Sequence, residues 1–411
     1  MQKTMLILVY MLFLIPKVNL ITIGGFYAGI RADDVIILFI GMCFFSNFLF
    51  TKTINIERTF ATFIFIMLVG NIVCGILFAQ GSILFPLRFI EYSIFFYLGR
   101  YLYNDSSERL SNLIGTVFWV NVAISVLQVV GVVGGFTVMG YKPNVSDRII
   151  GMTSGPWELG VLMNFTSAFY LIYGKNSLKR YIPYVLASVI ILLTGSRMSF
   201  VAQLVIIAVF IIKQGSFIQF LKKALIAVPL VFAMFIYVEN SSVSSRSENL
   251  FNSDNITSLA SLYEQTNVTY GNPDWHMVDT MAGDDVDLSW AMRVMKWLYA
   301  IKLFFKNPMF FVTGVGAGTF GNALDGGWLR LLLECGIFGF YAFLVFLKKV
   351  KNSSPMMLLF TIALGVNMLM IDVYMSYKIM TLYLFFAGYM LTWKKQQNEE
   401  NHNIVFTARA T

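Results

Sequence analysis

Charged residues are scarce in this chain. Asp, Glu, Lys and Arg make up only 13% of its 411 residues, hydrophobic residues make up 57%, and the mean hydropathy is +0.70. A soluble domain carries about 25% charged residues, so the composition excludes an ordinary soluble protein. We therefore interpret the chain as an integral membrane protein built as one polytopic domain rather than several soluble ones.

Histidine and cysteine are also rare, with two and three copies respectively. Cys43, Cys74 and Cys335 each lie within an apolar run, which indicates small buried residues rather than a disulfide framework. No His/Cys cluster has the spacing of a metal site, and we expect neither a metal nor a cofactor. The net charge of +8 does not indicate nucleic-acid binding, because the basic residues form no continuous patch with interleaved aromatics.

Apolar runs of membrane-spanning length fill most of the chain. A span needs roughly 20 mostly apolar residues, and by that measure we expect an all-α protein with about twelve transmembrane helices. Nine of them are expected within residues 1–238 and three within residues 329–393. The expected spans are Met5–Ile21, Val35–Phe50, Phe60–Phe78, Ile83–Tyr101, Leu113–Val133, Trp157–Tyr173, Tyr181–Leu193, Ser199–Ile212, Ala224–Val238, Leu329–Phe346, Met356–Ile371 and Ile379–Trp393.

Lys and Arg are concentrated in alternate loops, and this predicts the orientation. Loops between spans that carry excess Lys and Arg stay in the cytoplasm. The pattern places both termini in the cytoplasm, including the tail 394–411, and places loops 134–156 and 239–328 on the outer face. The basic loops carry Lys52 and Arg58, Arg100 and Arg109, Lys175, Lys179 and Arg180, Lys213, Lys222 and Lys223, Lys348, Lys349 and Lys351, and Lys394 and Lys395.

The outer loop 239–328 holds most of the polar residues. Its middle is acidic and includes His276, and residues 288–306 have the spacing of a basic amphipathic helix that lies in the membrane interface. A Gly-rich turn at 314–318 follows, and then Asp325, which is either a helix N-cap or a general base at the membrane surface.

Three further arginines interrupt the apolar pattern. Arg148 precedes a Gly-rich run and Pro156, so it accompanies either an ordinary capped helix start or an anion site at a helix N-terminus. Arg197 ends Thr194-Gly195-Ser196-Arg197, a tight turn between two spans, and is either a headgroup anchor or a phosphate ligand. Arg88 lies three residues before Glu91, so an ion pair along one helix competes with a substrate role.

Taken together and in order, four motifs resemble those of the O-antigen polymerase and ligase superfamily of bacterial envelopes. The resemblance covers most of the chain, including its topology and large outer loop. The motifs are Arg148–Gly160, Leu193–Arg197, Ser289–Gly318 with Arg293, Trp297 and Asn307-Pro308, and Asp325-Gly326-Gly327-Trp328-Leu329 followed by Gly336–Gly339.

The resemblance implies a metal-independent glycosyltransferase of GT-C-like architecture in the bacterial inner membrane, with its site facing the periplasm. Its donor would be a glycan on undecaprenyl pyrophosphate, and membrane lipids and a chain-length-determinant protein are expected partners. Fixed cations would stabilise the pyrophosphate leaving group. The implied catalytic residues are Arg148, Arg197, Arg293 and Asp325, with Glu158 as a second candidate base; the implied substrate-binding residues are Arg88, Lys142, Glu158, Trp328, Arg330 and His276.

Two alternatives to a polymerase stay open. Ligases of this superfamily carry a His-Asn pair where this chain has Asp325-Gly326, which favours a polymerase that transfers the growing glycan to a new lipid-linked repeat unit. A flippase or other transporter would also have about a dozen spans. That class is expected to show broken helices and polar residues near the membrane midplane, where this sequence is largely apolar.

Overall fold

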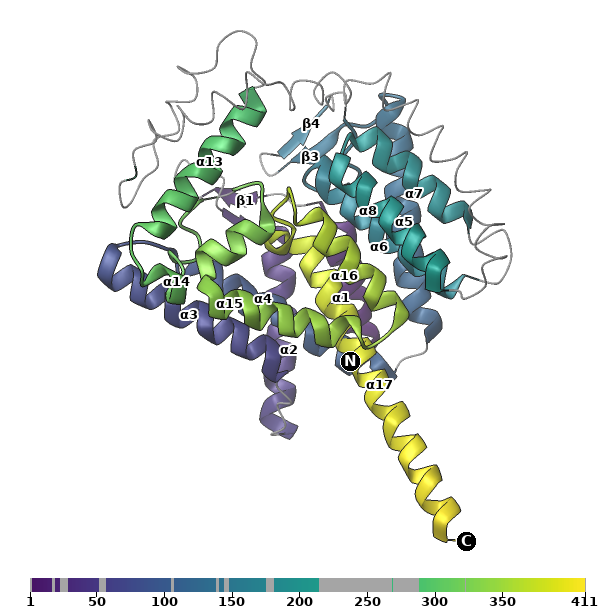
Figure 1. The fold of residues 1–411 in the computed structure, drawn as a ribbon. Helices are drawn as coiled ribbons and strands as arrows, with labels where there is room; N and C mark the ends of the chain where they lie inside the picture. Colours follow the sequence, from purple (N-terminus) through teal and green to yellow (C-terminus); the bar gives the residue numbers. More distant parts are fainter. Residues whose placement is uncertain are drawn as a thin grey trace.

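The computed structural model describes residues 2–16, 19–22, 29–51, 57–104, 107–137, 140–143, 148–174, 181–213, 268, 288–321 and 323–410. These residues are mostly helical, and the helices pack into a bundle (Figure 1). The helices are α1 (Gln2–Leu14), α2 (Ala32–Thr51), α3 (Arg58–Phe78), α4 (Leu84–Tyr101), η1 (Leu102–Asn104), α5 (Ser107–Val129), α6 (Pro156–Tyr173), α7 (Tyr181–Thr194), α8 (Arg197–Lys213), α13 (Leu288–Phe305), α14 (Phe310–Thr313), α15 (Gly327–Lys351), α16 (Pro355–Asn367), η4 (Val373–Met375) and α17 (Tyr377–Ala410).

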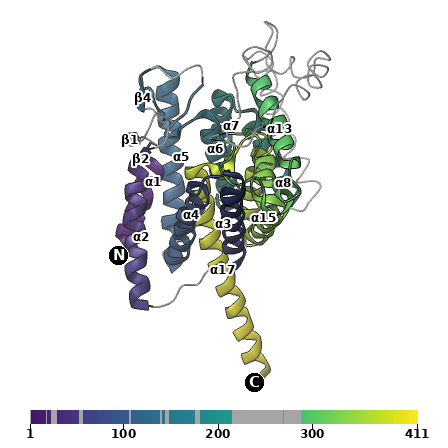
Figure 2. The same ribbon diagram turned by 90° about the vertical axis from the view of Figure 1, so that its left-hand side faces the viewer.

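Two short antiparallel hairpins qualify the expectation of an all-α chain. Strands β1 (Asn19–Thr22) and β2 (Gly29–Arg31) form one, and β3 (Gly135–Thr137) and β4 (Gly140–Lys142) form the other. The first hairpin begins where the first expected span should have continued to Ile21; α1 instead ends at Leu14, because a helix rarely continues up to a proline such as Pro16. Both hairpins and α13 lie at the end of the bundle opposite the C-terminus (Figure 2).

The described helices have the lengths and apolar composition of a membrane protein. Three of them contain stretches long and apolar enough to cross a bilayer: Arg58–Phe78, Ser111–Val129 and Gly327–Lys351. Shorter apolar helices accompany these, and each of the other expected spans within the described residues overlaps a helix over most of its length, whereas Met5–Ile21 does so only to Leu14. The expected span Ala224–Val238 lies outside the described residues. The number of spans, the domain boundaries and the orientation stay predictions.

The close approach of α4 and α17 depends on two glycines. A Cβ on Gly99 would clash with the carbonyl of Phe385, and a Cβ on Gly388 would clash with the carbonyl of Phe96. Each glycine therefore lets the backbone of one helix contact the other directly, as small residues do between membrane helices. This contact anchors α17 in the main core, and only beyond that core does α17 project from the bundle (Figure 2).

Helix α15 is not continuous. Gly336 has φ +66° and ψ −179°, which are not helical values, and α15 turns sharply along its length (Figure 1). A Cβ on Gly336 would clash with the carbonyl of Val312 in α14, so the break lets the end of α14 pack against the backbone of α15. The sequence predicted one unbroken span, Leu329–Phe346. A glycine inside an apolar run can adopt either sign of φ, so the sequence alone does not indicate the break.

Neutral polar side chains pack between α6, α8 and α16. Asn164, Ser199, Gln203 and Asn367 have no exposed surface. Asn164 donates to Gln203 Oε1 at 2.9 Å. Asn367 Nδ2 donates to Asn164 Oδ1 at 3.1 Å, and Asn367 Oδ1 accepts from the Ser199 hydroxyl at 2.8 Å. Hydrogen bonds among these four residues, which we call the Asn164 network, satisfy groups that would otherwise be costly to bury. The largely apolar midplane stays a prediction.

Candidate functional site

The first half of the site is a short loop that leads into α6. We call residues 148–155 the Arg148 loop. Helix α5 fixes its backbone: the Gln128 side-chain oxygen accepts hydrogen bonds from the N–H groups of Ile150 (3.1 Å) and Gly151 (2.9 Å), and Asn121 Oδ1 accepts one from Met152 N–H (3.0 Å). Both amide side chains are buried. The loop is therefore held in one conformation although it has no regular secondary structure.

The Arg148 side chain joins this loop to the turn between α7 and α8. Its Nε donates to the carbonyl of Thr194 at 2.7 Å, and its Nη2 donates to the carbonyl of Gly195 at 3.3 Å. These carbonyls lie at the C-terminus of α7, where a cation is favourable. Arg197 begins α8 two residues further on and is half-buried. Two of the four sequence motifs therefore meet in space.

The opposite side of the Arg148 loop contacts the start of α17. Glu158 is buried, and its Oε2 accepts hydrogen bonds from Ser154 N–H (2.8 Å) and Ser154 Oγ (2.7 Å). Its Oε1 accepts a bond from Ser376 Oγ at 2.5 Å, and the buried Lys378 ammonium donates to the Met152 carbonyl at 2.6 Å. Glu158 thus braces the first turn of α6, a position that fits a structural role better than that of a base open to substrate.

The second half of the site is the turn before α15, which we call the Asp325 turn (residues 323–326). Helix α13, expected at 288–306, lies over it: Lys296 Nζ donates to the Ala323 carbonyl at 3.1 Å, and Trp297 Nε1 to the Leu324 carbonyl at 2.9 Å. Arg293 Nε lies 3.1 Å from Asp325 Oδ2, with side chains 44% and 33% exposed. The proposed cation and the proposed base of this half are therefore ion-paired at the surface.

The backbone at Asp325 has a left-handed conformation. Its φ is +58°, one of two positive values among the described residues other than glycine. Left-handed residues other than glycine cost on the order of 1–3 kcal/mol and concentrate at functional sites. The N-cap of α15 is Gly326, so the N-cap interpretation of Asp325 was wrong. Its carboxylate points instead toward Arg293.

A buried ion cluster holds the Asp325 turn from below. Arg330 has no exposed surface; its Nη1 lies 2.9 Å from Asp372 Oδ2 and its Nε 3.1 Å from Glu334 Oε1. Asp372 also accepts hydrogen bonds from the N–H groups of Leu324 (2.7 Å) and Gly326 (3.1 Å), the two neighbours of Asp325. One carboxylate therefore grips the backbone on both sides of the candidate base.

The cluster extends to the Gly-rich turn and to α4. Glu334 Oε1 accepts from the N–H of Gly318 at 3.1 Å, and Glu334 Oε2 accepts from the Tyr374 hydroxyl at 3.3 Å. Burial, followed by the charge of Glu334, raises the pKa of Tyr374 well above that of free tyrosine, so this hydroxyl stays a donor. The Phe85 ring has the Arg330 guanidinium 5.4 Å and the Arg88 guanidinium 5.2 Å from its centroid. Arg88 thus lies beside the cluster, and its ion pair with Glu91 stays a prediction.

The segment 372–378 connects the two halves. Asp372 holds the Asp325 turn, while Ser376 and Lys378 hold α6 and the Arg148 loop. Four residues of chain span at most about 14 Å, so the Cα atoms of Asp372 and Ser376 lie within that distance. From the sequence pattern, this segment was predicted only to connect two spans. Its signal was an Asp and a Lys between apolar runs, which in a membrane protein is a reason to suspect a function.

The remaining predicted residues lie apart from these contacts. Lys142 ends β4 and is exposed. Trp328 docks α15 on α16, because its Nε1 donates to the Gly365 carbonyl at 2.8 Å. His276 lies outside the described residues. Within the described part of the chain, no three His, Cys, Asp or Glu side chains gather as they would to hold a metal ion, and the expectation of a metal-independent protein stays a prediction.

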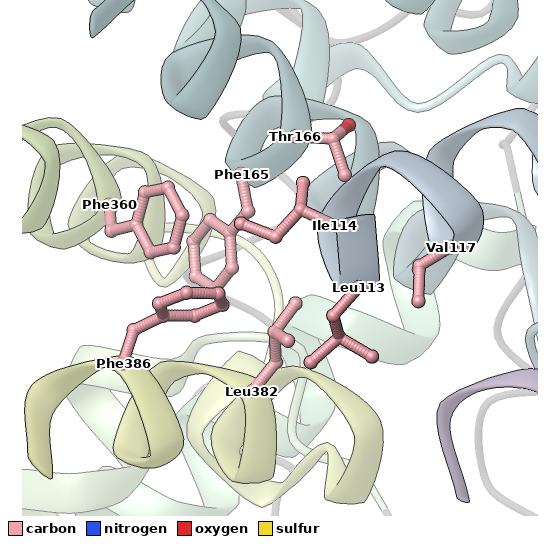
Figure 3. A pocket seen from close by; sticks show the side chains of 8 residues that line it. All are labelled: Leu113, Ile114, Val117, Phe165, Thr166, Phe360, Leu382 and Phe386. Carbon is pink, nitrogen blue, oxygen red and sulfur yellow. The ribbon is translucent and has the colours of Figure 1, made fainter. Parts of the chain in front are cut away.

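A small apolar pocket lies elsewhere, between α5, α6, α16 and α17 (Figure 3). Phe165 and Phe360 stack within it at 4.5 Å between ring centroids, and Phe386 closes one side. Thr166, its one polar lining residue, donates its hydroxyl to the Met163 carbonyl of the same helix. Thr166 lies eight residues after Glu158, about 12 Å along α6, so the pocket is separate from the polar site.

We compared the chain with known protein families and curated proteins. The chain matches no protein-family model and no curated protein. The geometry alone therefore defines the candidate site. It consists of two polar, tightly hydrogen-bonded centres of a membrane protein, joined by the segment 372–378.

Proposed function

We propose that the protein is a membrane glycosyltransferase that polymerises a lipid-linked surface polysaccharide, as an O-antigen polymerase does. The growing glycan would pass from undecaprenyl pyrophosphate to a sugar hydroxyl of an incoming lipid-linked repeat unit. The observation that carries this proposal is the convergence of the Arg148 loop and the Asp325 turn on the segment 372–378. Residues from widely separated parts of the chain are thus linked through one short segment.

The arrangement suits departure of a pyrophosphate. The bond from the sugar anomeric carbon to the pyrophosphate oxygen breaks, the acceptor oxygen bonds to that carbon, and the negative charge stays on the leaving group. Preorganised cations stabilise such developing charge at no reorganisation cost. In our proposal Arg148, Arg197 and Arg293 supply the positive charge, and Asp325 accepts the hydroxyl proton, a contribution on the order of 10²–10⁴-fold.

The Arg293–Asp325 pair supports a role for both residues. An exposed ion pair contributes only about 0–1 kcal/mol, so it opens at little cost. When a pyrophosphate binds Arg293, the Asp325 carboxylate is released and can face the acceptor hydroxyl. We further propose twelve spans, both termini in the cytoplasm and this site on the periplasmic face of a bacterial inner membrane, with lipids and a chain-length-determinant protein as partners.

A transporter of lipid-linked oligosaccharides is the second candidate, and two observations favour it. Helix α15 is broken at Gly336, and polar side chains fill the space between α6, α8 and α16. Broken helices and buried polar residues occur at transporter substrate sites. The Asn164 network is uncharged, however, and its members hydrogen-bond one another. Charged residues gather instead in the two halves of the candidate site. This distribution favours chemistry at the membrane surface.

Deleting the gene and examining the surface polysaccharide on gels separates the candidates. Loss of a polymerase leaves lipid A core with a single repeat unit, and loss of a ligase leaves bare core with polymer on the lipid carrier. Loss of a transporter leaves bare core and strands single lipid-linked units on the cytoplasmic side. On the gel, a working polymerase gives a ladder of polysaccharide chain lengths. Complementation with Arg148→Ala, Arg197→Ala, Arg293→Ala or Asp325→Ala should reduce this ladder strongly, since loss of one electrostatic stabiliser lowers the catalytic rate about 10²–10³-fold.

Arg100→Ala is the matched control, because Arg100 lies in the last turn of α4, at the predicted cytoplasmic side. It should restore the full ladder. If the four site variants also restore it at normal protein levels, the catalytic assignment is wrong.

A further inference from the structure

Lys378 is a buried cation that the proposed chemistry leaves unexplained. It lies in the first turn of α17, is only 4% exposed, and donates from Nζ to the Met152 carbonyl at 2.6 Å. Burying an ammonium group is costly unless its surroundings compensate. The hydrogen bond to the Met152 carbonyl is one contact that compensates this cost, and it ties α17 to the Arg148 loop.

The Met152 peptide is gripped from two sides. Its N–H donates to Asn121 Oδ1 on α5 at 3.0 Å, and its carbonyl accepts from Lys378 on α17 at 2.6 Å. Nearby, Glu158 is tied to α17 through Ser376. Glu158 is therefore linked to the same end of α17 as Lys378, and its carboxylate accepts hydrogen bonds from Ser154 and Ser376.

We propose that Lys378 is a positioning residue for the Arg148 loop. Its hydrogen bond holds the α17 side of the loop so that Arg148 stays on the carbonyls of Thr194 and Gly195, beside Arg197. Its charge adds positive potential to the same loop. That this loop receives a pyrophosphate rests on the proposed function; that Lys378 fixes the loop does not.

Hydrogen exchange on the full-length protein in detergent tests the positioning directly. In Lys378→Met, the loop amides of Ile150, Gly151 and Met152 should exchange about tenfold faster than in the wild type. The reason is that the loop loses the hydrogen bond from α17 to the Met152 carbonyl. Lys378→Arg keeps a charged donor and should restore most of the protection. Unchanged exchange in Lys378→Met would overturn the proposal, whatever the activity.

Lys394→Met is the matched control. Lys394 lies on the same helix and donates to a backbone carbonyl, that of Asn352, at the same 2.6 Å, but at the other end of the bundle. It should leave exchange in the Arg148 loop as in the wild type. Should Lys378→Met not accumulate as folded protein, Lys378→Ala removes both the charge and the donor and serves in its place.

Calorimetric titration with inorganic pyrophosphate separates failure of this proposal from failure of the proposed function. Wild type should bind, Lys378→Met should bind about tenfold more weakly, and Lys394→Met should bind normally. Faster exchange without any pyrophosphate binding by the wild type would support the positioning role and count against the proposed function. Faster exchange with unchanged pyrophosphate affinity would refute the claim that this positioning serves anion binding.

Discussion

Two Arg–Asp pairs of similar geometry sit in opposite surroundings. Arg293 and Asp325 are 3.1 Å apart with 44% and 33% of their side chains exposed, whereas Arg330 and Asp372 are 2.9 Å apart with 0% and 7% exposed. An exposed pair is hydrated and exchanges partners readily. A buried pair is locked, because opening it leaves charges without water. Burial, rather than residue type, therefore separates the pair that can act on a substrate from the pair that builds the platform.

The two pairs are also connected. Asp372 binds the N–H groups of Leu324 and Gly326, so the buried pair fixes the backbone on which Asp325 is displayed. The strained φ of Asp325 persists because its neighbours are held on both sides. The exposed pair thus depends on the buried one.

Removing the buried carboxylate should have the largest effect on stability. Asp372→Ala leaves Arg330 with Glu334 as its remaining carboxylate partner and leaves two backbone N–H groups without their acceptor, so we expect a loss of about 3–5 kcal/mol. Chemical denaturation of the purified protein in detergent measures it. Asp372→Asn retains an oxygen for the backbone donors and should lose less. A loss below about 1 kcal/mol for Asp372→Ala would show that the buried cluster is not the platform.

Long apolar runs made the helices predictable, because a bilayer span leaves a signal in every one of its residues. The motifs around Arg148 and Asp325 were also visible as glycines, a proline and isolated charges. Their partners were not. The carbonyls that bind Arg148 belong to residues 46 and 47 positions later, and the carboxylate that grips the Asp325 turn comes from Asp372, within a segment treated as a connector. Sequence spacing predicts which face a residue occupies, but such pairings depend on how helices pack.

The exposed pair should show the reverse pattern, with little effect on stability and a large effect on function. Asp325→Gly removes the carboxylate and suits the left-handed backbone, so stability should stay within about 1 kcal/mol of wild type while the polysaccharide ladder is lost. Asp325→Ala removes the same carboxylate but keeps a Cβ at φ +58°. It should be less stable than Asp325→Gly by about 1 kcal/mol.

Denaturation curves of the two variants, together with polysaccharide gels, test this prediction. Equal stability of the glycine and alanine variants would mean that the backbone at Asp325 is unstrained. A full ladder from either variant would remove Asp325 from the proposed chemistry.

A third ion pair of intermediate burial gives the smallest expected effect. Glu57 precedes α3, and its Oε1 lies 2.6 Å from Lys349 Nζ, with side chains 13% and 45% exposed. Burial alone raises the pKa of Glu57, but hydrogen bonds from Lys349 and Thr59 and the charge of Lys349 outweigh it, so the folded pKa lies below the ordinary value. A carboxyl with a lowered pKa stabilises the fold above its unfolded pKa of about 4.3, and the gain is lost as pH falls through the folded value.

Glu57→Gln should therefore be less stable than wild type by a few tenths to about 1 kcal/mol at pH 7. The difference should stay constant down to about pH 5 and shrink below about pH 4, because protonation of Glu57 then removes the wild-type advantage. Denaturation at a series of pH values measures this, and a difference that grows as pH falls would show that the sign is wrong. Because Lys349 is largely hydrated, salt should reduce the difference as well, whereas it should leave the loss in Asp372→Ala nearly unchanged.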